Sequence, residues 1–218
     1  MSEPGLFETM YQCRAIRYFK DEPVANDVIR KVLDAAIQAP SGSNRQSWHF
    51  VVVTDPAIKK TIQGYYKQSF DVYASMMAHV PPRTGVTEET QARVVKSAVY
   101  LSEHLHEAPV LIIPCLTFEQ GRIAGDGAMQ DMARKSLYSS IYPAVQNLLL
   151  ACRGVGLAAC LTTLHLMYEE PIAELLGLPE NAETMALIPI GWPNAKFGPV
   201  KRVPVEEFAS RNRFGQQL

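Results

Sequence analysis

The stretch "APSGSNRQSWHFVVVTD", residues 39–55, joins a polar loop directly to an apolar run. Its second half, "WHFVVVT", is rich in aromatic and β-branched residues, which are enriched in strands. We therefore predict a buried strand in this half. The first half places proline, serine, glycine and asparagine together, which is more polar than a plain connector needs. This composition is typical of a loop that holds a polar ligand against a sheet.

Helices are predicted on both sides of this strand. Residues 25–39 have apolar side chains at helical spacing, with Asn26 as a candidate cap. Thr87 is a candidate cap for a later helix, because two glutamates follow it and would suit the positive end of the helix. The predicted helices up to this point span residues 4–13, 25–39, 56–78 and about 87–106.

Three further strands are predicted at residues 108–118, 157–164 and 184–193, where apolar and β-branched residues dominate. Residues 119–136 are polar and contain glycine, which predicts a mobile loop or lid. Residues 136–156 form a mostly apolar helix, and Pro143 should bend it or lie near its start. A short helix, 168–178, ends at Gly177. Few strands with helices between them indicate an α+β or mixed α/β fold.

The composition limits the possible functions. The chain has 218 residues, of which 47% are hydrophobic, and a formal net charge of -1. We predict one globular domain over residues 1–218, with an extended C-terminal segment from about residue 196. The near-neutral charge argues against nucleic acid as a partner, and the apolar runs are too short to span a membrane. Four cysteines without a C-x-x-C pair favour a reducing compartment, so we expect a cytoplasmic protein.

Two basic segments suggest a bound phosphate. Arg14 and Arg17 in "CRAIRYF" lie three residues apart and can converge on one phosphate, which arginine binds in a fork. Lys201 and Arg202 in "GPVKRVP" are presented rigidly between prolines. The alternative for each pair alone is an ordinary solvated basic surface. Together with the Ser/Asn loop, the two pairs favour a phosphorylated cofactor.

Other motifs carry weaker signals. "RGVGLAA" fits G-x-G-x-x-A, but it follows a predicted helix where the dinucleotide fingerprint follows a strand. His104 and His106 lie two residues apart and point to different faces of a helix, so no metal site is predicted. Thr162 and Thr163 stand near the end of a predicted strand. They reflect either simple β-propensity or a hydroxyl directed at a ligand.

Five segments, in this order, resemble the nitroreductase-like FMN-dependent oxidoreductase family: "CRAIRYF", "APSGSNRQSWHF", "EAPVLII", "AVQNLLLACRGVGL" and "PVKRVP". The likeness covers nearly the whole chain. It implies an α+β fold with a central, mostly antiparallel sheet flanked by helices. It also implies an intertwined homodimer that holds one FMN at each of two interface sites.

Matching the family residue by residue implies the cofactor contacts. The arginines of both basic segments, helped by Lys201, fall on the FMN phosphate, and the Pro40–Asn44 loop falls on the ribityl chain and ring, in part from the partner subunit. Ser140 falls at the pyrimidine edge. Thr163, or Thr162 if the register slips, falls near flavin N5 and is the candidate catalytic residue. The full set is Arg14, Ala15, Arg17, Pro40, Ser41, Gly42, Ser43, Asn44, Ser140, Leu161, Thr162, Thr163, Leu164, Lys201 and Arg202.

The chain departs from the family pattern at four positions. Cys13 replaces the family's first arginine, which weakens the phosphate site unless Lys201 compensates. Ala15 replaces a serine and leaves only a backbone N–H, and Ser47 replaces a proline. Thr163 stands where several nitroreductases have glutamate. That exchange resembles the subgroup of the iodotyrosine deiodinases and the flavin-cleaving lower-ligand synthase.

The resemblance implies an enzyme that passes reducing equivalents from NAD(P)H to a nitroaromatic, a quinone or a similar small aromatic substrate by a ping-pong mechanism. Two alternatives stay open: a specialised flavoenzyme, which would be a reductive dehalogenase or a flavin-fragmenting enzyme, and a non-catalytic flavin-binding protein. Residues about 65–100 and 117–135 are expected to shape the substrate pocket. The candidates for stacking on the substrate are Tyr65, Tyr66, Phe70, Tyr73 and Phe118.

Overall fold

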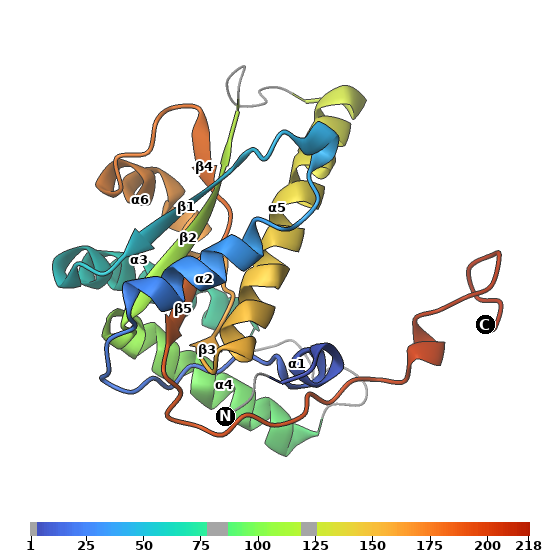
Figure 1. Ribbon diagram of the computed structural model, residues 1–218, viewed down its shortest axis with the longest axis horizontal. Coiled ribbons are helices and arrows are strands. Elements are labelled where there is room, and N and C mark those ends of the chain that lie inside the picture. The colour runs from blue at the N-terminus through green and yellow to red at the C-terminus, as the bar shows by residue number, and fades with distance from the viewer. Residues whose placement is uncertain (1–3, 78–86, 119–125) are drawn as a thin grey trace.

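A computed structural model describes residues 4–77, 87–118 and 126–218 and contains one antiparallel sheet flanked by helices (Figure 1). The strands follow the order β1 (Trp48–Val53), β2 (Val110–Thr117), β5 (Ile188–Gly191) and β3 (Ala158–Ala159). A short strand, β4 (Ala182–Thr184), also pairs with β2. The predicted α+β fold with a mostly antiparallel sheet is confirmed.

Strand β2 lies at the centre of the core because both of its faces are covered. Seven of its eight residues are buried, and such a strand carries a continuous apolar run instead of an alternating one. Its even-numbered residues, such as Ile112, pack in one hydrophobic cluster, and its odd-numbered residues, such as Ile113, pack in another. The sheet therefore separates two hydrophobic layers.

The two layers are built by different helices. α2 (Asn26–Ala36) and α5 (Ala128–Gly154) supply the cluster that contains Ile112. α3 (Pro56–Met77) and α4 (Glu88–His104) supply the cluster that contains Ile113. A short 3-10 helix, Leu164–Tyr168, and α6 (Glu169–Leu175) follow the strand β3. α1 (Leu6–Gln12) lies beside the C-terminal end of α5, and the chain's own C-terminal segment runs away from the body of the molecule (Figure 1).

The helix α5 begins earlier than predicted, and Pro143 lies in its interior. It begins at Ala128, so residues 128–136 are helical where a loop was predicted, while residues 119–125 lie outside the described residues. Pro143 lies inside the helix and not near its start. A proline costs one backbone hydrogen bond. Buried neighbours such as Ile141 and Leu148 hold the helix against the sheet on both sides of that defect.

Three other boundaries also differ from the predictions. Of the predicted strand 157–164 only β3 is regular, and Thr162 forms an isolated bridge with Leu187 before the chain turns into the 3-10 helix. The predicted strand 184–193 is shorter and corresponds to β5, and the helix predicted to reach His106 ends at His104. None of the described helices is long and apolar enough to cross a membrane. In the same ranges, no cluster of His, Cys, Asp or Glu side chains could hold a metal ion.

Candidate functional site

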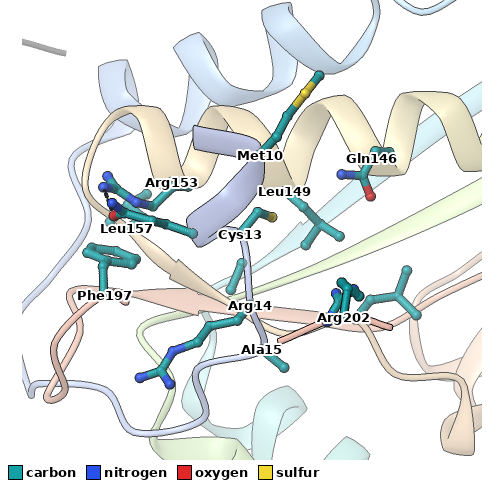
Figure 2. Close-up of a pocket in the computed structure, with 13 residues that line it drawn as sticks. Met10, Cys13, Arg14, Ala15, Gln146, Leu149, Arg153, Leu157, Phe197 and Arg202 are labelled. Carbon is teal, nitrogen blue, oxygen red and sulfur yellow. Dashed lines mark hydrogen bonds between the residues drawn. The ribbon is translucent and has the colours of Figure 1, made fainter. Parts of the chain in front are cut away.

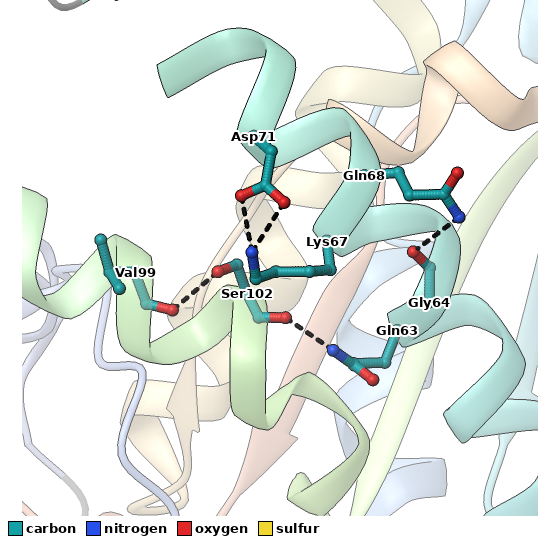
Figure 3. Close-up of polar contacts among 7 residues, drawn as sticks. All are labelled: Gln63, Gly64, Lys67, Gln68, Asp71, Val99 and Ser102. Atoms are coloured by element: carbon teal, nitrogen blue, oxygen red, sulfur yellow. Dashed lines mark hydrogen bonds and ion pairs between the residues drawn. The ribbon is translucent and has the colours of Figure 1, made fainter. Parts of the chain in front are cut away.

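A cavity of about 290 Å³ lies where the end of α1, the last turns of α5 and the C-terminal segment meet (Figure 2). Four residues of the predicted cofactor set line it together: Arg14, Ala15, Leu161 and Arg202. They come from three segments that are far apart in the sequence. The structure thus brings the N-terminal and C-terminal basic segments to one place, as the phosphate hypothesis requires.

Backbone hydrogen bonds hold these segments against the end of the sheet. The N–H of Ile16 donates to the carbonyl of Ala159 at 3.1 Å, which places the chain that carries Arg14 beside β3. The N–H of Val200 donates to the carbonyl of Tyr11 at 2.8 Å, which brings Arg202 alongside. The lining groups are therefore fixed by main-chain contacts and not by the side chains alone.

A third arginine, Arg153, also lines the cavity and was missed by the sequence analysis. Its side chain is only 13% exposed, its Nη2 donates to Gln12 Oε1 at 2.5 Å, and Glu8 Oε1 lies 3.9 Å away. The guanidinium carbon lies 4.3 Å from the centre of the Phe197 ring. Its buried Nε–H has no acceptor among the described residues. Arg153 follows Gln146 and Leu149 on one face of α5, and this helical spacing was the available signal.

The charges in the cavity favour an anion. Arg14, Arg153 and Arg202 bring three guanidinium groups to a chain whose net charge is -1. Between them lies Cys13, and burial raises the pKa of its thiol although the charges of Arg153 and Arg202 oppose that rise. A thiol that stays neutral adds no negative charge. The cavity therefore suits a phosphate, which arginine binds through several charge-assisted hydrogen bonds.

Arg17 lies elsewhere, so the expectation that Arg14 and Arg17 converge on one group does not hold in this structure. Arg14 Nη2 donates to the carbonyl of Lys196 at 2.9 Å, whereas Arg17 Nη1 donates to Ser97 Oγ on α4 at 2.9 Å. Lys201 is exposed and is not among the residues that line the cavity. In this structure the cations of the cavity are therefore contributed by arginines other than Arg17.

The two adjacent threonines have different environments. Thr162 Oγ1 lies 3.2 Å from the hydroxyl of Tyr66, whose pKa burial raises to about 12. Leu164 packs against the core. Thr163 is exposed, as is Leu161, which lines the cavity. The accessible hydroxyl of the pair is thus that of Thr163, whereas Thr162 is bound inside the fold.

The polar loop of residues 40–46 has a strained backbone. Ser43, Asn44 and Gln46 have φ values of 53°, 54° and 52°, in the left-handed region that residues other than glycine seldom adopt. Gly42 N donates to Ser140 Oγ at 3.1 Å, and Gln46 N donates to Ser41 Oγ at 3.0 Å. Strain of this kind is common at ligand sites. Pro40 and residues 42–46 are exposed, so the loop presents its polar groups to the surface.

The loop and the arginine cavity lie on different parts of the chain. Ser140, which holds the loop, and Leu149, which lines the cavity, are about 14 Å apart along the axis of α5. Ser140 and Gln146 are separated by about 120° around that helix, so they lie on different faces. One chain alone therefore does not bring the two halves of the predicted site together.

Three of the five stacking candidates are unavailable to a ligand on this chain. Tyr66, Phe70 and Phe118 are buried, with at most 8% of each residue exposed. Tyr65 stacks on Tyr168, with ring centres 5.2 Å apart. Only Tyr73, at 45% exposed, keeps a largely open ring.

The fold and the cavity define an α+β protein with an arginine-lined cavity at the end of an antiparallel sheet. The sequence profile described as "Nitroreductase family" matches residues 11–192. The chain belongs to the nitroreductase family, whose members of similar structure are flavoproteins.

The chain is 30% identical to iodotyrosine deiodinase 1 of Rattus norvegicus over 196 residues, which cover 89% of this chain and 64% of the rat protein. It thus spans less than two thirds of that relative. It is also 30% identical to NADH dehydrogenase of Thermus thermophilus over 194 residues, which cover 88% of this chain and 89% of that one. An iodotyrosine deiodinase structure bound to FMN and 3-iodo-L-tyrosine has a TM-score of 0.68 and 22% identity, with 96% and 99% of the two chains covered.

Proposed function

We propose that this protein is an FMN-dependent oxidoreductase that takes reducing equivalents from NAD(P)H and passes them to a nitroaromatic, a quinone or a similar electron-poor aromatic. The observation that carries the proposal is the cavity where Arg14, Arg153 and Arg202 meet. The proposal is supported by relatives named as an NADH dehydrogenase and as deiodinases. It is also supported by a structural neighbour that holds FMN.

The residues present fit a flavin phosphate. A phosphate carries nearly two negative charges, and three arginines line the cavity. FMN would supply the redox chemistry, accepting a hydride from the nicotinamide and reducing the second substrate after the first has left.

The protein's own groups would bind and orient the reactants. The arginines would anchor the phosphate, and their positive charge would also stabilise negative charge that develops on the reduced cofactor. The exposed hydroxyl of Thr163 is the group we propose to donate a hydrogen bond near flavin N5. Neither role requires a protein acid or base in the ping-pong scheme.

We further propose that the enzyme is a homodimer and that the polar loop of one subunit completes the site of the other. A cavity of about 290 Å³ is at the small end of ligand sites, so one chain encloses only part of such a cofactor. The loop and the cavity lie on different faces of α5 in one chain. The C-terminal segment also exposes large apolar side chains, with Phe208 76% exposed, and a partner subunit would cover them.

Reconstitution with FMN followed by anaerobic reduction tests the proposal. The purified protein should bind about one FMN per chain, lose its absorption near 450 nm on addition of NADPH or NADH, and regain it with a nitroarene or a quinone. A chain that binds no flavin would refute the proposal. Flavin that neither nicotinamide reduces would instead identify a non-catalytic flavin-binding protein.

Reductive dehalogenation is the second candidate, because the match to the deiodinases covers 89% of the chain and Thr163 is uncharged. A flavin-fragmenting enzyme is the further variant of this alternative. Chemically reduced enzyme supplied with 3-iodotyrosine or with a nitroarene separates them. Fast release of iodide with slow nitroarene turnover would favour the dehalogenase, and oxygen-dependent loss of the flavin itself would favour the fragmenting enzyme.

A further inference from the structure

Cys13 and Arg153 line the same cavity but come from different parts of the chain. Cys13 stands at the position where the resemblance to the family implies a first arginine. Arg153, in the last turn of α5, opens onto the same cavity. We propose that Arg153 is a phosphate-binding residue of this chain and replaces the missing arginine. The inference rests on the proposed function, because it assumes that the cavity receives the phosphate of FMN.

The positions of the three side chains support the exchange. Cys13 lies between Arg153 and Arg202 in the cavity (Figure 2). Both guanidinium groups are close enough to stabilise the charged form of the Cys13 thiol. An anion beside Cys13 therefore lies within the electrostatic reach of both cations. Arg153 therefore brings a positive charge close to the position at which the resemblance implies an arginine.

Arg153 is also prepared to bind a ligand at small entropic cost. Its guanidinium stacks on Phe197 and is held by Gln12, so the side chain is already ordered. Ordering a long side chain upon binding would otherwise weaken the complex. Arginine carries five N–H donors. One of them is bonded to Gln12, and the buried Nε–H has no acceptor within the described part of the chain.

The competing account makes Arg153 a purely structural clamp. In this account Arg153 joins α1 to the C-terminal segment. It contacts Gln12 and, at a longer distance, Glu8 on α1, and it contacts Phe197 in the C-terminal segment. A clamp would lower the stability of the protein when removed, and it would affect all flavins alike. A phosphate-binding residue would affect FMN and leave riboflavin unchanged, because riboflavin lacks the phosphate. The two ligands therefore separate the two accounts.

The test measures the dissociation constants of FMN and riboflavin for the full-length apoprotein by quenching of flavin fluorescence. Arg153→Met keeps an unbranched side chain against Phe197 but removes the charge. The matched control is Arg30→Met, which removes one positive charge from an exposed position on α2. We expect Arg153→Met to weaken FMN about ten- to hundredfold, in line with the loss of a charge-assisted contact, and to change riboflavin less than about twofold. Arg30→Met should change neither.

A rescue experiment sharpens the assignment. Cys13→Arg restores the family's arginine inside the same cavity and should recover most of the FMN affinity of Arg153→Met. Thermal unfolding shows whether each variant is folded, and Arg153→Lys, which retains the charge, replaces Arg153→Met if the latter does not fold. The Lys variant should then weaken FMN more than riboflavin, because lysine cannot reproduce a forked contact.

The outcomes are distinct. Equal weakening of both flavins, no weakening of either, or no rescue by Cys13→Arg would overturn the assignment of Arg153. Each of these results would leave the proposed function intact, because wild-type protein would still bind FMN. If wild-type protein binds neither flavin, the proposed function fails, and the assignment of Arg153 fails with it.

Discussion

Acidification should destabilise this protein through one buried histidine. His165 is 0% exposed, lies in the 3-10 helix that follows Thr163, and has no partner for either ring nitrogen among the described residues. Burial lowers its pKa from 6.5 to about 4, and no charged neighbour contributes to that shift. Between pH 6.5 and about 4, the His165 ring is therefore protonated in the unfolded chain but not in the folded chain. Stability should be unaffected by His165 above pH 6.5 and should fall as the pH drops toward 4.

The size of the effect follows from the two pKa values. The full interval corresponds to roughly 3 kcal/mol, and about 2 kcal/mol of it should already be lost at pH 5 relative to pH 7.5. Urea unfolding at both pH values, at fixed protein concentration and with the same flavin content, gives the free energy of unfolding. His165→Leu is the comparison variant, because leucine is apolar and of similar size and does not titrate.

The comparison isolates His165, because every other titrating group is common to both proteins. His165→Leu should lose about 2 kcal/mol less than wild type between pH 7.5 and pH 5. At pH 7.5 it should be at least as stable as wild type, since the substitution removes two unpaired nitrogens from the core. Equal losses in the two proteins would refute the reasoning. A ring-proton NMR titration with a pKa near 6.5 would do the same.

Two further predictions concern the cavity and the sheet. Arg14→Ala combined with Arg202→Ala should yield mostly apoprotein, measured as the ratio of absorbance at about 450 and 280 nm, and full retention of FMN would contradict the phosphate assignment. Gly191→Ala should destabilise the fold by about 1–3 kcal/mol or prevent folding, because the new Cβ would lie 2.6 Å from Pro109 Cδ. Gly154→Ala has nothing within 4 Å and should leave the melting temperature unchanged or raise it, so equal effects at the two glycines would contradict the steric argument.

The parts of the fold that follow from local patterns were predictable. β1 and β2 are buried runs of β-branched and apolar residues, and their observed bounds lie within two residues of the predicted ones. The start of α5 was not predictable in this way. Met129, Met132 and Ala133 do have helical spacing, but polar residues separate them, and the two methionines stay exposed and add nothing to the core. Glycines before Ala128 added a misleading loop signal.

The candidate site was predictable as a set of residue types and not as an arrangement. The arginines of both basic segments could be picked out from sequence, yet Arg17 bonds to Ser97 on α4 while Arg14 lines the cavity. A spacing of three residues indicates convergence only where the chain is helical, and here it is extended beside β3. The direction of a side chain in such a segment depends on its partners across the sheet, which a local pattern does not contain.

The proposed role of Arg153 depends on its position in space, because it lines the same cavity as Cys13 but lies far from it in the sequence. With cysteine at position 13 in place of arginine, the first basic segment taken alone carries one positive charge fewer for a phosphate. A bound phosphate needs positive charge at one point of the cavity, and any element that reaches that point can supply the charge. The register of α5 places Gln146, Leu149 and Arg153 on one face, and that face meets the chain at Cys13. A loss at one position of a motif is therefore informative only after the neighbouring elements have been searched for a replacement.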